Sequence, residues 1–238
     1  MVNIFSPNAL YGIDSFLVLL IIITTFSISY YSNKVYKIVK KRNYKIFSFA
    51  FLLLGFSYIF QIFSNIIIYY RVRVAPDIIF IITSHLPYAG LINTVFHFLY
   101  ELFSITAFIL LFFLISSKKR ENLFIFIYLG IIVAIVSIYF PPIYHITLVV
   151  LLVFLGLHFF QNYERVKSMN SFFVFFAFLL LLISNLILTF SGLHVIFYIA
   201  GGFLTFVAYT LLLINQINIK NGTKKNETRG SKGHIRSS

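Results

Sequence analysis

Seven long apolar blocks, separated by short polar or basic segments, run through the 238-residue chain. The blocks are about 18–27 residues long, and a helix needs about 20 apolar residues to cross the hydrocarbon core of a bilayer. A membrane β-strand needs only about ten residues of strictly alternating polarity, which excludes a barrel. The pattern predicts an all-α, polytopic membrane protein with seven transmembrane helices. We expect these helices at Ala9–Tyr31, Tyr44–Tyr70, Gly90–Ser116, Asn122–Tyr139, Ile143–Phe160, Ser171–Phe190 and Val195–Ile217.

The segments between and after the blocks define the domain organisation. We expect one seven-helix transmembrane domain at residues 1–217. A basic, flexible cytoplasmic tail is predicted at residues 218–238, because this stretch is polar and rich in Gly, Ser and Asn. The link after the second block has an apolar, β-branched centre at Ile78–Thr83, which is typical of an interfacial segment or a short strand. All five prolines lie at or beyond predicted helix ends, which disfavours the broken-helix design of many carriers.

Composition and charge agree with a membrane protein and set its orientation. Hydrophobic residues make up 60% of the chain and charged residues 11%, which leaves too few polar residues to cover a soluble domain. With the N-terminus outside, all of the 19 Lys and Arg residues except Arg71 and Arg73 fall in cytoplasmic connectors or in the tail. This positive-inside pattern predicts a multi-pass protein of the cell membrane with a cytoplasmic C-terminus. The net charge of +13 therefore reports topology and attraction to membrane lipids, and we expect no nucleic-acid partner.

An internal repeat is the next feature of the pattern. The motif Phe-Ala-Phe-Leu-Leu-Leu-x-x-Ser occurs at residues 49–57 and again at residues 176–184. The third and seventh predicted helices also align, with Ser104 against Thr205 and Glu101 against Gly202. One helix separates the two halves, so both would have the same orientation, as in parallel-repeat transporters. We interpret the chain as a 3+1+3 parallel repeat, and coincidence of apolar composition is the alternative.

The third block carries the most unusual residues of the chain. His97 and Glu101 lie one helical turn apart, and Glu101 is near the middle of the block. An ionisable residue at this depth costs at least about 3 kcal/mol on insertion scales, so it is expected to face the protein interior and to have a use. A His–Glu pair at this spacing can share a proton. We predict a proton or cation site here, and the alternative is a structural pair that holds the bundle together.

Polar side chains on four of the predicted helices can complete this site. In lipid these groups must turn inward and pair with one another or with water. Gly201 and Gly202 would let a neighbour or ligand approach the backbone of the seventh helix. The predicted ligand or proton site consists of His97, Glu101, Asn93, Gln61, Asn65, Asn185, Tyr198, Thr205 and Tyr209.

Signatures of catalysis and of metal or cofactor binding are missing. The chain has no cysteine, no Gly-x-Ser-x-Gly, no His-Glu-x-x-His and no phosphate-binding glycine loop. His85, His145 and His194 fall in the outer connectors without a close metal-ligand spacing. We therefore predict no catalytic residue, no metal site and no cofactor, and an intramembrane hydrolase is kept as an alternative.

Two stretches resemble known membrane proteins. Tyr44–Ser57, with the basic turn before it, and the polar face of Gly201–Leu213 resemble uncharacterised small seven-transmembrane-helix proteins of archaea. That resemblance implies the fold and no established function. The three-one-three layout is also similar to that of microbial rhodopsins and of small sugar and amino-acid carriers. However, the seventh predicted helix has no lysine for a retinal Schiff base, and the Pro-Gln motif of Pro-Gln-loop carriers is missing.

Three classes of function follow from this reading. The leading one is movement or sensing of a small solute, proton or cation through a polar cavity bounded by the second, third, sixth and seventh predicted helices. It predicts a wet cavity at His97 and Glu101 that is open to one side. A receptor that signals through a cytoplasmic partner, bound by the basic tail, predicts an outer pocket. A structural subunit of a membrane complex predicts a filled interior.

Overall fold

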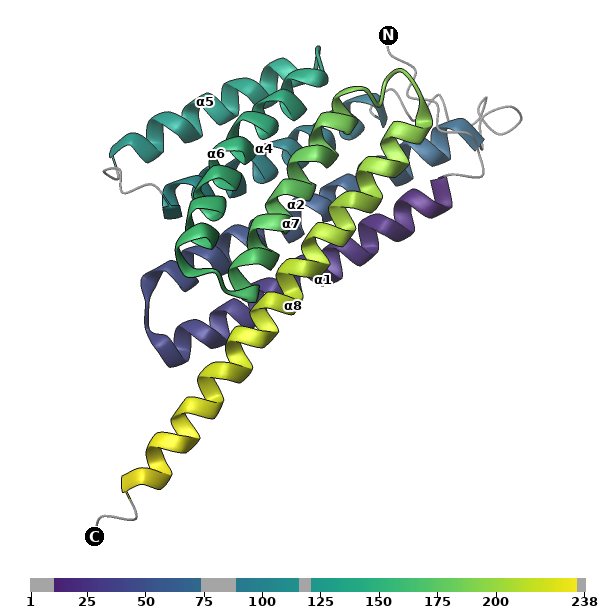
Figure 1. Ribbon diagram of the computed structural model, residues 1–238. Coiled ribbons are helices and arrows are strands. Elements are labelled where there is room, and N and C mark those ends of the chain that lie inside the picture. Colours follow the sequence, from purple (N-terminus) through teal and green to yellow (C-terminus); the bar gives the residue numbers. More distant parts are fainter. Residues whose placement is uncertain (1–10, 74–88, 116–120, 235–238) are drawn as a thin grey trace.

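The computed structural model describes residues 11–73, 89–115 and 121–234, and the regular secondary structure of these residues is entirely helical (Figure 1). Six of the described helices are long and apolar enough to cross a membrane, and a seventh is shorter. The prediction of a polytopic helical membrane protein is confirmed. The segment at Ile78–Thr83 and His85 lie outside the described residues. The helices are α1 (Tyr11–Val39), α2 (Arg42–Arg73), α4 (Ala89–Ile115), α5 (Glu121–Ser137), α6 (Pro142–Val166), α7 (Met169–Thr189) and α8 (Val195–His234).

The first helix continues well past its predicted end at Tyr31. Because α1 runs to Val39, most of the basic segment that we predicted as a connector is helical. Ser32 and Val35 are buried and keep the inward face of the helix in contact with its neighbours. Ser32 Oγ also donates a hydrogen bond to the carbonyl of Tyr44 at 3.0 Å. Lysine side chains on the other faces can extend toward water while the backbone stays helical.

Two further helices also extend beyond their predicted ends. α6 reaches Val166 instead of ending at Phe160, and α8 reaches His234 instead of ending at Ile217. Residues 218–234 contain no proline, so nothing in the backbone forces the helix to stop. Figure 1 shows the last part of α8 extending beyond the rest of the bundle.

The helix α5 is shorter than the other helices. It has 17 residues. Such a helix rises about 25 Å, which is less than the hydrocarbon thickness of about 30 Å. The sequence predicts a helix at Asn122–Tyr139, whereas α5 ends at Ser137 and residues 138–141 form the turn into α6. Six long apolar helices and one short one therefore replace the seven similar spans that we expected.

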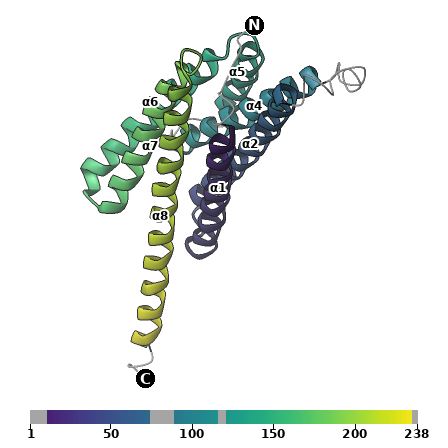
Figure 2. The same cartoon turned by 90° about the vertical axis from the view of Figure 1, so that its right-hand side faces the viewer.

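The long helices form two groups that close into a ring. α1, α2 and α4 pack side by side, and α6, α7 and α8 do the same on the other side of the molecule (Figure 2). α1 also packs on α8, and α4 packs on α6, which closes the ring. In the described part of the chain, α5 packs against α4 and α6 outside the ring. The interior of the bundle is therefore enclosed by all six long helices.

The turns after α1 and α6 have the same structure. Lys40 and Lys167 both adopt the left-handed conformation, with φ values of 55° and 49°. Each donates its backbone N–H to the carbonyl four residues earlier, at 2.7 Å in both cases. The sequence spacing between these lysines equals the spacing between the two copies of the apolar motif, at residues 49–57 and 176–184. The left-handed turn and the apolar motif therefore occupy equivalent positions in the helix pairs α1–α2 and α6–α7.

The serine that ends each copy of the motif makes an equivalent contact. Ser57 Oγ in α2 donates a hydrogen bond to the carbonyl of Tyr100 in α4 at 2.8 Å. Ser184 Oγ in α7 lies 2.8 Å from the carbonyl of Gly201 in α8 and also shares a 2.6 Å contact with the Thr205 hydroxyl. Tyr100 and Gly201 fall opposite each other in the alignment of the third and seventh predicted helices. The second and third helices of each half are therefore joined in the same way.

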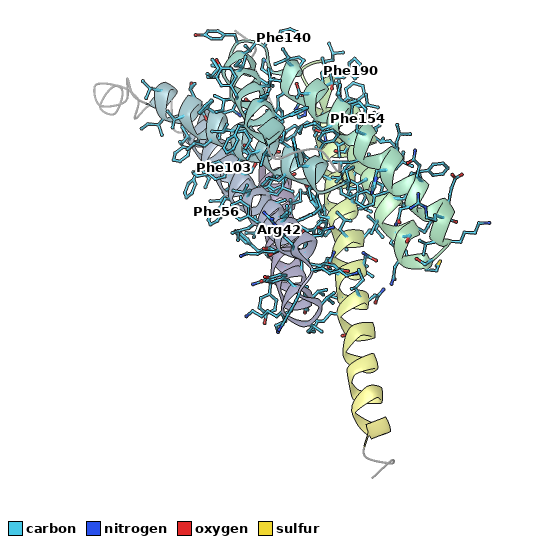
Figure 3. The ribbon with its side chains drawn as sticks, turned by 90° about the vertical axis from the view of Figure 1, so that its left-hand side faces the viewer. Arg42, Phe56, Phe103, Phe140, Phe154 and Phe190 are labelled. Carbon is cyan, nitrogen blue, oxygen red and sulfur yellow. The ribbon has the colours of Figure 1, made fainter. Side chains whose placement is uncertain are left out.

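Large apolar side chains cover the outside of the bundle. Phe56 in α2, Phe154 in α6 and Phe190, directly after α7, are labelled in Figure 3 and are 42%, 53% and 53% exposed. Aromatic rings in such numbers are unfavourable against water and favourable against lipid tails. The outer surface is therefore suited to a bilayer.

Gly201 provides the first testable prediction, because it allows α7 and α8 to pack closely. A Cβ added at Gly201 would lie 2.6 Å from Leu188 Cγ, whereas a Cβ added at Gly156 would meet no atom within 4 Å. Overpacking of this kind typically costs about 1–3 kcal/mol, and we expect Gly201→Ala to lower the stability by that amount. The matched control Gly156→Ala should be neutral or slightly stabilising, because Ala forms helix better than Gly. Thermal unfolding midpoints in one detergent measure both, and equal midpoints would contradict the close packing.

Candidate functional site

A cavity of about 530 Å³ lies inside the ring of six long helices. Its lining comes mainly from the N-terminal halves of α1, α4, α6 and α8 and from the C-terminal halves of α2 and α7. These halves all lie at the same end of the bundle. Residues of the two connections at that end, 139–141 and 191–193, line the cavity as well. The cavity therefore extends from the middle of the bundle toward one end.

The structure brings all nine residues of the predicted site to this cavity. We predicted a cavity bounded by the helices now labelled α2, α4, α7 and α8, and the structure adds α1 and α6 to the lining. A shared cavity does not test what these residues do, so their role stays a prediction. They are His97, Glu101, Asn93, Gln61, Asn65, Asn185, Tyr198, Thr205 and Tyr209.

The carboxylate of Glu101 faces the protein interior, as its depth in α4 predicts. Its side chain is 1% exposed, and Oε1 lies 3.3 Å from Nε2 of His97. The His97 side chain is 37% exposed, so the pair links a buried carboxylate to a more accessible imidazole. The spacing of the two residues on α4 creates the contact, because side chains four positions apart lie on one face of a helix.

The second carboxylate oxygen of Glu101 contacts Ser137, the last residue of α5. The Ser137 hydroxyl is within hydrogen-bonding distance of Glu101 Oε2 and also lies 2.8 Å from the carbonyl oxygen of Ala134. A hydroxyl has one proton, so it can donate to only one of these acceptors at a time. When Glu101 is ionised, Ser137 can donate to it. When Glu101 is protonated, it can donate to Ser137, which then donates to Ala134. Both protonation states are therefore satisfied with the helices in the same place.

His145 belongs to the cavity, although we assigned it to an outer connector. It lies in the first turn of α6, and its Nδ1 is 3.2 Å from Oδ1 of Asn185 in α7. The assignment was wrong because His145 already falls within the helix predicted at Ile143–Phe160, and α6 indeed contains it. The sequence holds a signal that would have found this residue. His145 lies next to Tyr144 and three residues before Leu148, and both of these are buried.

Tyrosine side chains line the inner end of the cavity, in the middle of the bundle. The hydroxyls of Tyr58 and Tyr209 lie 3.2 Å apart, and the Tyr144 hydroxyl donates to Ser104 Oγ at 2.9 Å. Farther along the bundle, away from the cavity end, apolar side chains are packed in the core. Apolar side chains at most 1% exposed occupy this region, among them Phe51, Leu54, Leu155, Phe178 and Leu212.

Amide side chains of the predicted site make hydrogen bonds within the protein. Asn93 Oδ1 accepts a hydrogen bond from Ser64 Oγ at 2.6 Å, and Gln61 Nε2 lies 3.5 Å from the Tyr198 hydroxyl. Gln61 Oε1 is buried and has no hydrogen-bond partner in the described part of the chain. The structural alternative, in which the His–Glu pair holds the bundle together through Gln61 or Asn185, stays a prediction; the contact of Glu101 with another helix described here is the one with Ser137 of α5.

The described lining of the cavity contains little fixed charge. Glu101 is its only carboxylate, and it includes no lysine and no arginine. His97 and His145 supply the imidazole rings of this lining. In the described ranges, no group of three or more His, Asp or Glu residues is placed to hold a metal ion. The chemistry available here is proton binding and the recognition of a small polar or positively charged molecule.

No protein-family model matches the sequence, and comparisons with curated proteins and with solved structures give no significant match. The resemblance to small archaeal seven-helix proteins therefore stays a prediction from the sequence. Function has to be argued from the geometry of the cavity alone.

The contact between Ser137 and Glu101 provides the second testable prediction. A hydrogen bond to a charged group contributes about 1.5–3 kcal/mol, so we expect Ser137→Ala to lower the stability by about this amount. In the Glu101→Gln background the same substitution should cost less, about 0.5–1.5 kcal/mol, because the partner is neutral. Unfolding midpoints of the four proteins of this double-mutant cycle measure the coupling. Strictly additive effects would show that the two side chains do not interact.

Proposed function

We propose that the protein moves a small solute across the membrane through the cavity that contains His97 and Glu101, with proton binding at this pair coupled to the movement. One observation carries this proposal. A cavity of about 530 Å³ extends to one end of the bundle and holds a carboxylate that is 1% exposed. Buried ionisable groups at membrane depth are costly and commonly mark ion or substrate pathways. A purely structural subunit predicts a filled interior, so the cavity favours the handling of a ligand.

The distribution of positive charge supports an outward-facing cavity. The end opposite the cavity contains basic residues, among them Lys40 and Lys41 between α1 and α2, Arg42 at the start of α2, and Lys167 between α6 and α7. The positive-inside rule assigns that end to the cytoplasm. We infer that the N-terminus and the cavity face the outside of the cell membrane and that α8 ends in the cytoplasm.

A 3+1+3 organisation, with α5 as the seventh span, supports a carrier in particular. α4 and α6 run in the same direction, so α5 returns the chain toward the cavity side, and its last residue, Ser137, lies level with Glu101 near the middle of α4. The left-handed turns at Lys40 and Lys167 and the hydrogen bonds of Ser57 and Ser184 support the equivalence of the two halves. Carriers built from repeats expose a central site to alternate sides by moving one repeat against the other. We infer the same type of motion here.

The proposed coupling is tested by flux into proteoliposomes that contain a trapped pH-sensitive dye. Neutral solutes, organic cations and inorganic cations are added one class at a time, with the pH gradient imposed in either direction. We expect one class to change the internal pH with wild-type protein and the change to be lost in Glu101→Gln, because the substitution removes the proton-binding carboxylate. The matched control Glu164→Gln changes an exposed carboxylate in the last turn of α6, at the end of the bundle opposite the cavity, and should keep the activity.

The carrier proposal fails if no class produces a pH change above that of protein-free liposomes. It also fails if Glu101→Gln and Glu164→Gln behave alike. Solute binding that depends on Glu101 but produces no flux would instead favour the receptor that signals through a cytoplasmic partner.

The orientation can be tested with single cysteines, because the natural chain contains none. Leu193 lies at the cavity end and Met169 at the opposite end, and they are 77% and 70% exposed. We expect Leu193→Cys to react with a membrane-impermeant maleimide added to intact cells. Met169→Cys should react only after the membrane is permeabilised. The reverse labelling pattern would invert the proposed topology.

A further inference from the structure

We infer that the ligand of the cavity is a small organic monocation, such as a quaternary ammonium, and that it exchanges with a proton at the pair of Glu101 and His97. This inference rests on the proposed function and names its substrate class. It depends on three properties of the cavity: its charge, the use of its polar groups and its aromatic rings.

The charge of the described lining disfavours an anion and a metal ion. Among the described lining residues, Glu101 is the only carboxylate, and none is a lysine or arginine that could bind an anionic group. A hard metal ion needs several oxygen ligands in a compact cage. No cluster of three acidic or histidine side chains suited to a metal occurs in the described residues. A molecule of single positive charge matches the one carboxylate that the cavity supplies.

The hydrogen bonds within the lining disfavour a sugar-like ligand. Asn93 is paired with Ser64, and Asn185 contacts His145 and donates to the carbonyl of Leu181. These hydrogen bonds take up part of the capacity of the amide groups, which leaves less of it for a ligand that is recognised by many hydrogen bonds. The buried lining atom left without a partner in the described structure is an acceptor, the Oε1 of Gln61. An unpaired acceptor oxygen adds negative potential to the site, which favours a cation.

The aromatic rings of the cavity suit a cation that carries alkyl groups. Tyr58, Tyr100, Tyr144 and Tyr209 come from α2, α4, α6 and α8 and form a continuous cluster. The ring centroids of Tyr100 and Tyr144 are 5.5 Å apart with planes inclined by 57°, and those of Tyr58 and Tyr209 are 5.9 Å apart at 78°. Tyr58 and Tyr100, at 6.2 Å and 51°, join the two pairs. Inclined aromatic faces beside a carboxylate are the usual recognition of alkylammonium groups.

Exchange with a proton keeps the charge of the site balanced. The other titratable groups in the described lining around Glu101 are His97 on α4, His145 on α6 and the tyrosines of α2, α4, α6 and α8. α5 supplies the neutral Ser137, and α1 supplies apolar lining. As a cation enters, the proton shared by Glu101 and His97 leaves to water. As the cation leaves, a proton returns to the pair. Ser137 can hydrogen-bond to the carboxyl group in both states.

The test compares three probes of nearly the same shape on the purified full-length protein. Choline is the cation, dimethylbutanol replaces its quaternary nitrogen by carbon, and dimethylbutanoate is the corresponding anion. Isothermal titration calorimetry in two buffers of different ionisation enthalpy gives the affinity and the number of protons released. We expect choline to bind at least about tenfold more tightly than dimethylbutanol, consistent with a cation–π and charge contribution of about 1–2 kcal/mol. We expect proton release on choline binding and no measurable binding of dimethylbutanoate.

Variants assign the effect to the cavity. Glu101→Gln should weaken choline binding about tenfold or more and abolish proton release, while Glu164→Gln should leave both unchanged. Tyr100→Leu should weaken binding several-fold, whereas Tyr100→Phe, which keeps the ring, should stay close to the wild type. The comparison of probes on the wild type needs no variant, so it remains decisive if Glu101→Gln does not fold.

Several results would overturn the inference. These are equal binding of choline and dimethylbutanol, tighter binding of the anion, or unchanged binding in Glu101→Gln. Its failure is distinct from failure of the carrier proposal. Flux of a neutral or inorganic solute that depends on Glu101, without choline binding, would reject the organic cation and leave the carrier intact. Choline binding that depends on Glu101, without any flux, would reject the carrier and leave the ligand class intact.

Discussion

A carboxyl group in the middle of a membrane helix needs partners, and much of this structure can be understood from that requirement. An isolated charge at such a depth costs at least about 3 kcal/mol even on insertion scales. His97 supplies one partner from the preceding turn of α4, and Ser137 supplies the other from α5. The contact with Ser137 ties the end of α5 to α4, and the ring of long helices separates Glu101 from lipid. The cost of burying the acid is thus met by tertiary structure rather than by α4 alone.

The two halves of the bundle are alike in their packing and different in their chemistry. Equivalent turns and equivalent serine hydrogen bonds occur in both halves. At the position aligned with Glu101, the second half has Gly202, and a Cβ there would meet only Leu17 Cδ1, at 3.9 Å. The second half also has no described counterpart of α5 packed against α8. The two halves therefore pack in the same way, but the ionisable residue Glu101 belongs to the first half.

Much of the site follows from local pattern, and the remainder depends on contacts that leave no local signal. Asn93, His97 and Glu101 share a helical face, so their common orientation could be predicted from spacing. Ser137 could not be predicted, because it lies 36 residues from Glu101 along the chain and at a helix end without periodicity. His145 was assigned to the outer connectors because it lies near the outer end of its predicted helix, and nothing local shows that its ring reaches Asn185 of α7.

The ends of the helices could also be predicted only in part from the sequence. Basic residues after Tyr31 looked like a connector, yet the buried positions Ser32 and Val35 continue the inward face of α1. Charge alone therefore marks the water-exposed end of a helix poorly, because long basic side chains can reach water from inside a helix. The apolar blocks predicted correctly where helices occur, but they predicted the ends of those helices less well.

The length of α5 has a consequence for the membrane around the protein. Placed across a bilayer, a helix of 17 residues is shorter than the hydrocarbon core is thick, so the bilayer beside it has to become thinner or the helix has to shift along the membrane normal. Either adjustment acts directly on the residue that holds the buried acid, since Ser137 is the last residue of α5. The thickness of the surrounding bilayer is therefore mechanically linked to the environment of Glu101. The chain length of the surrounding lipids therefore affects the environment of Glu101.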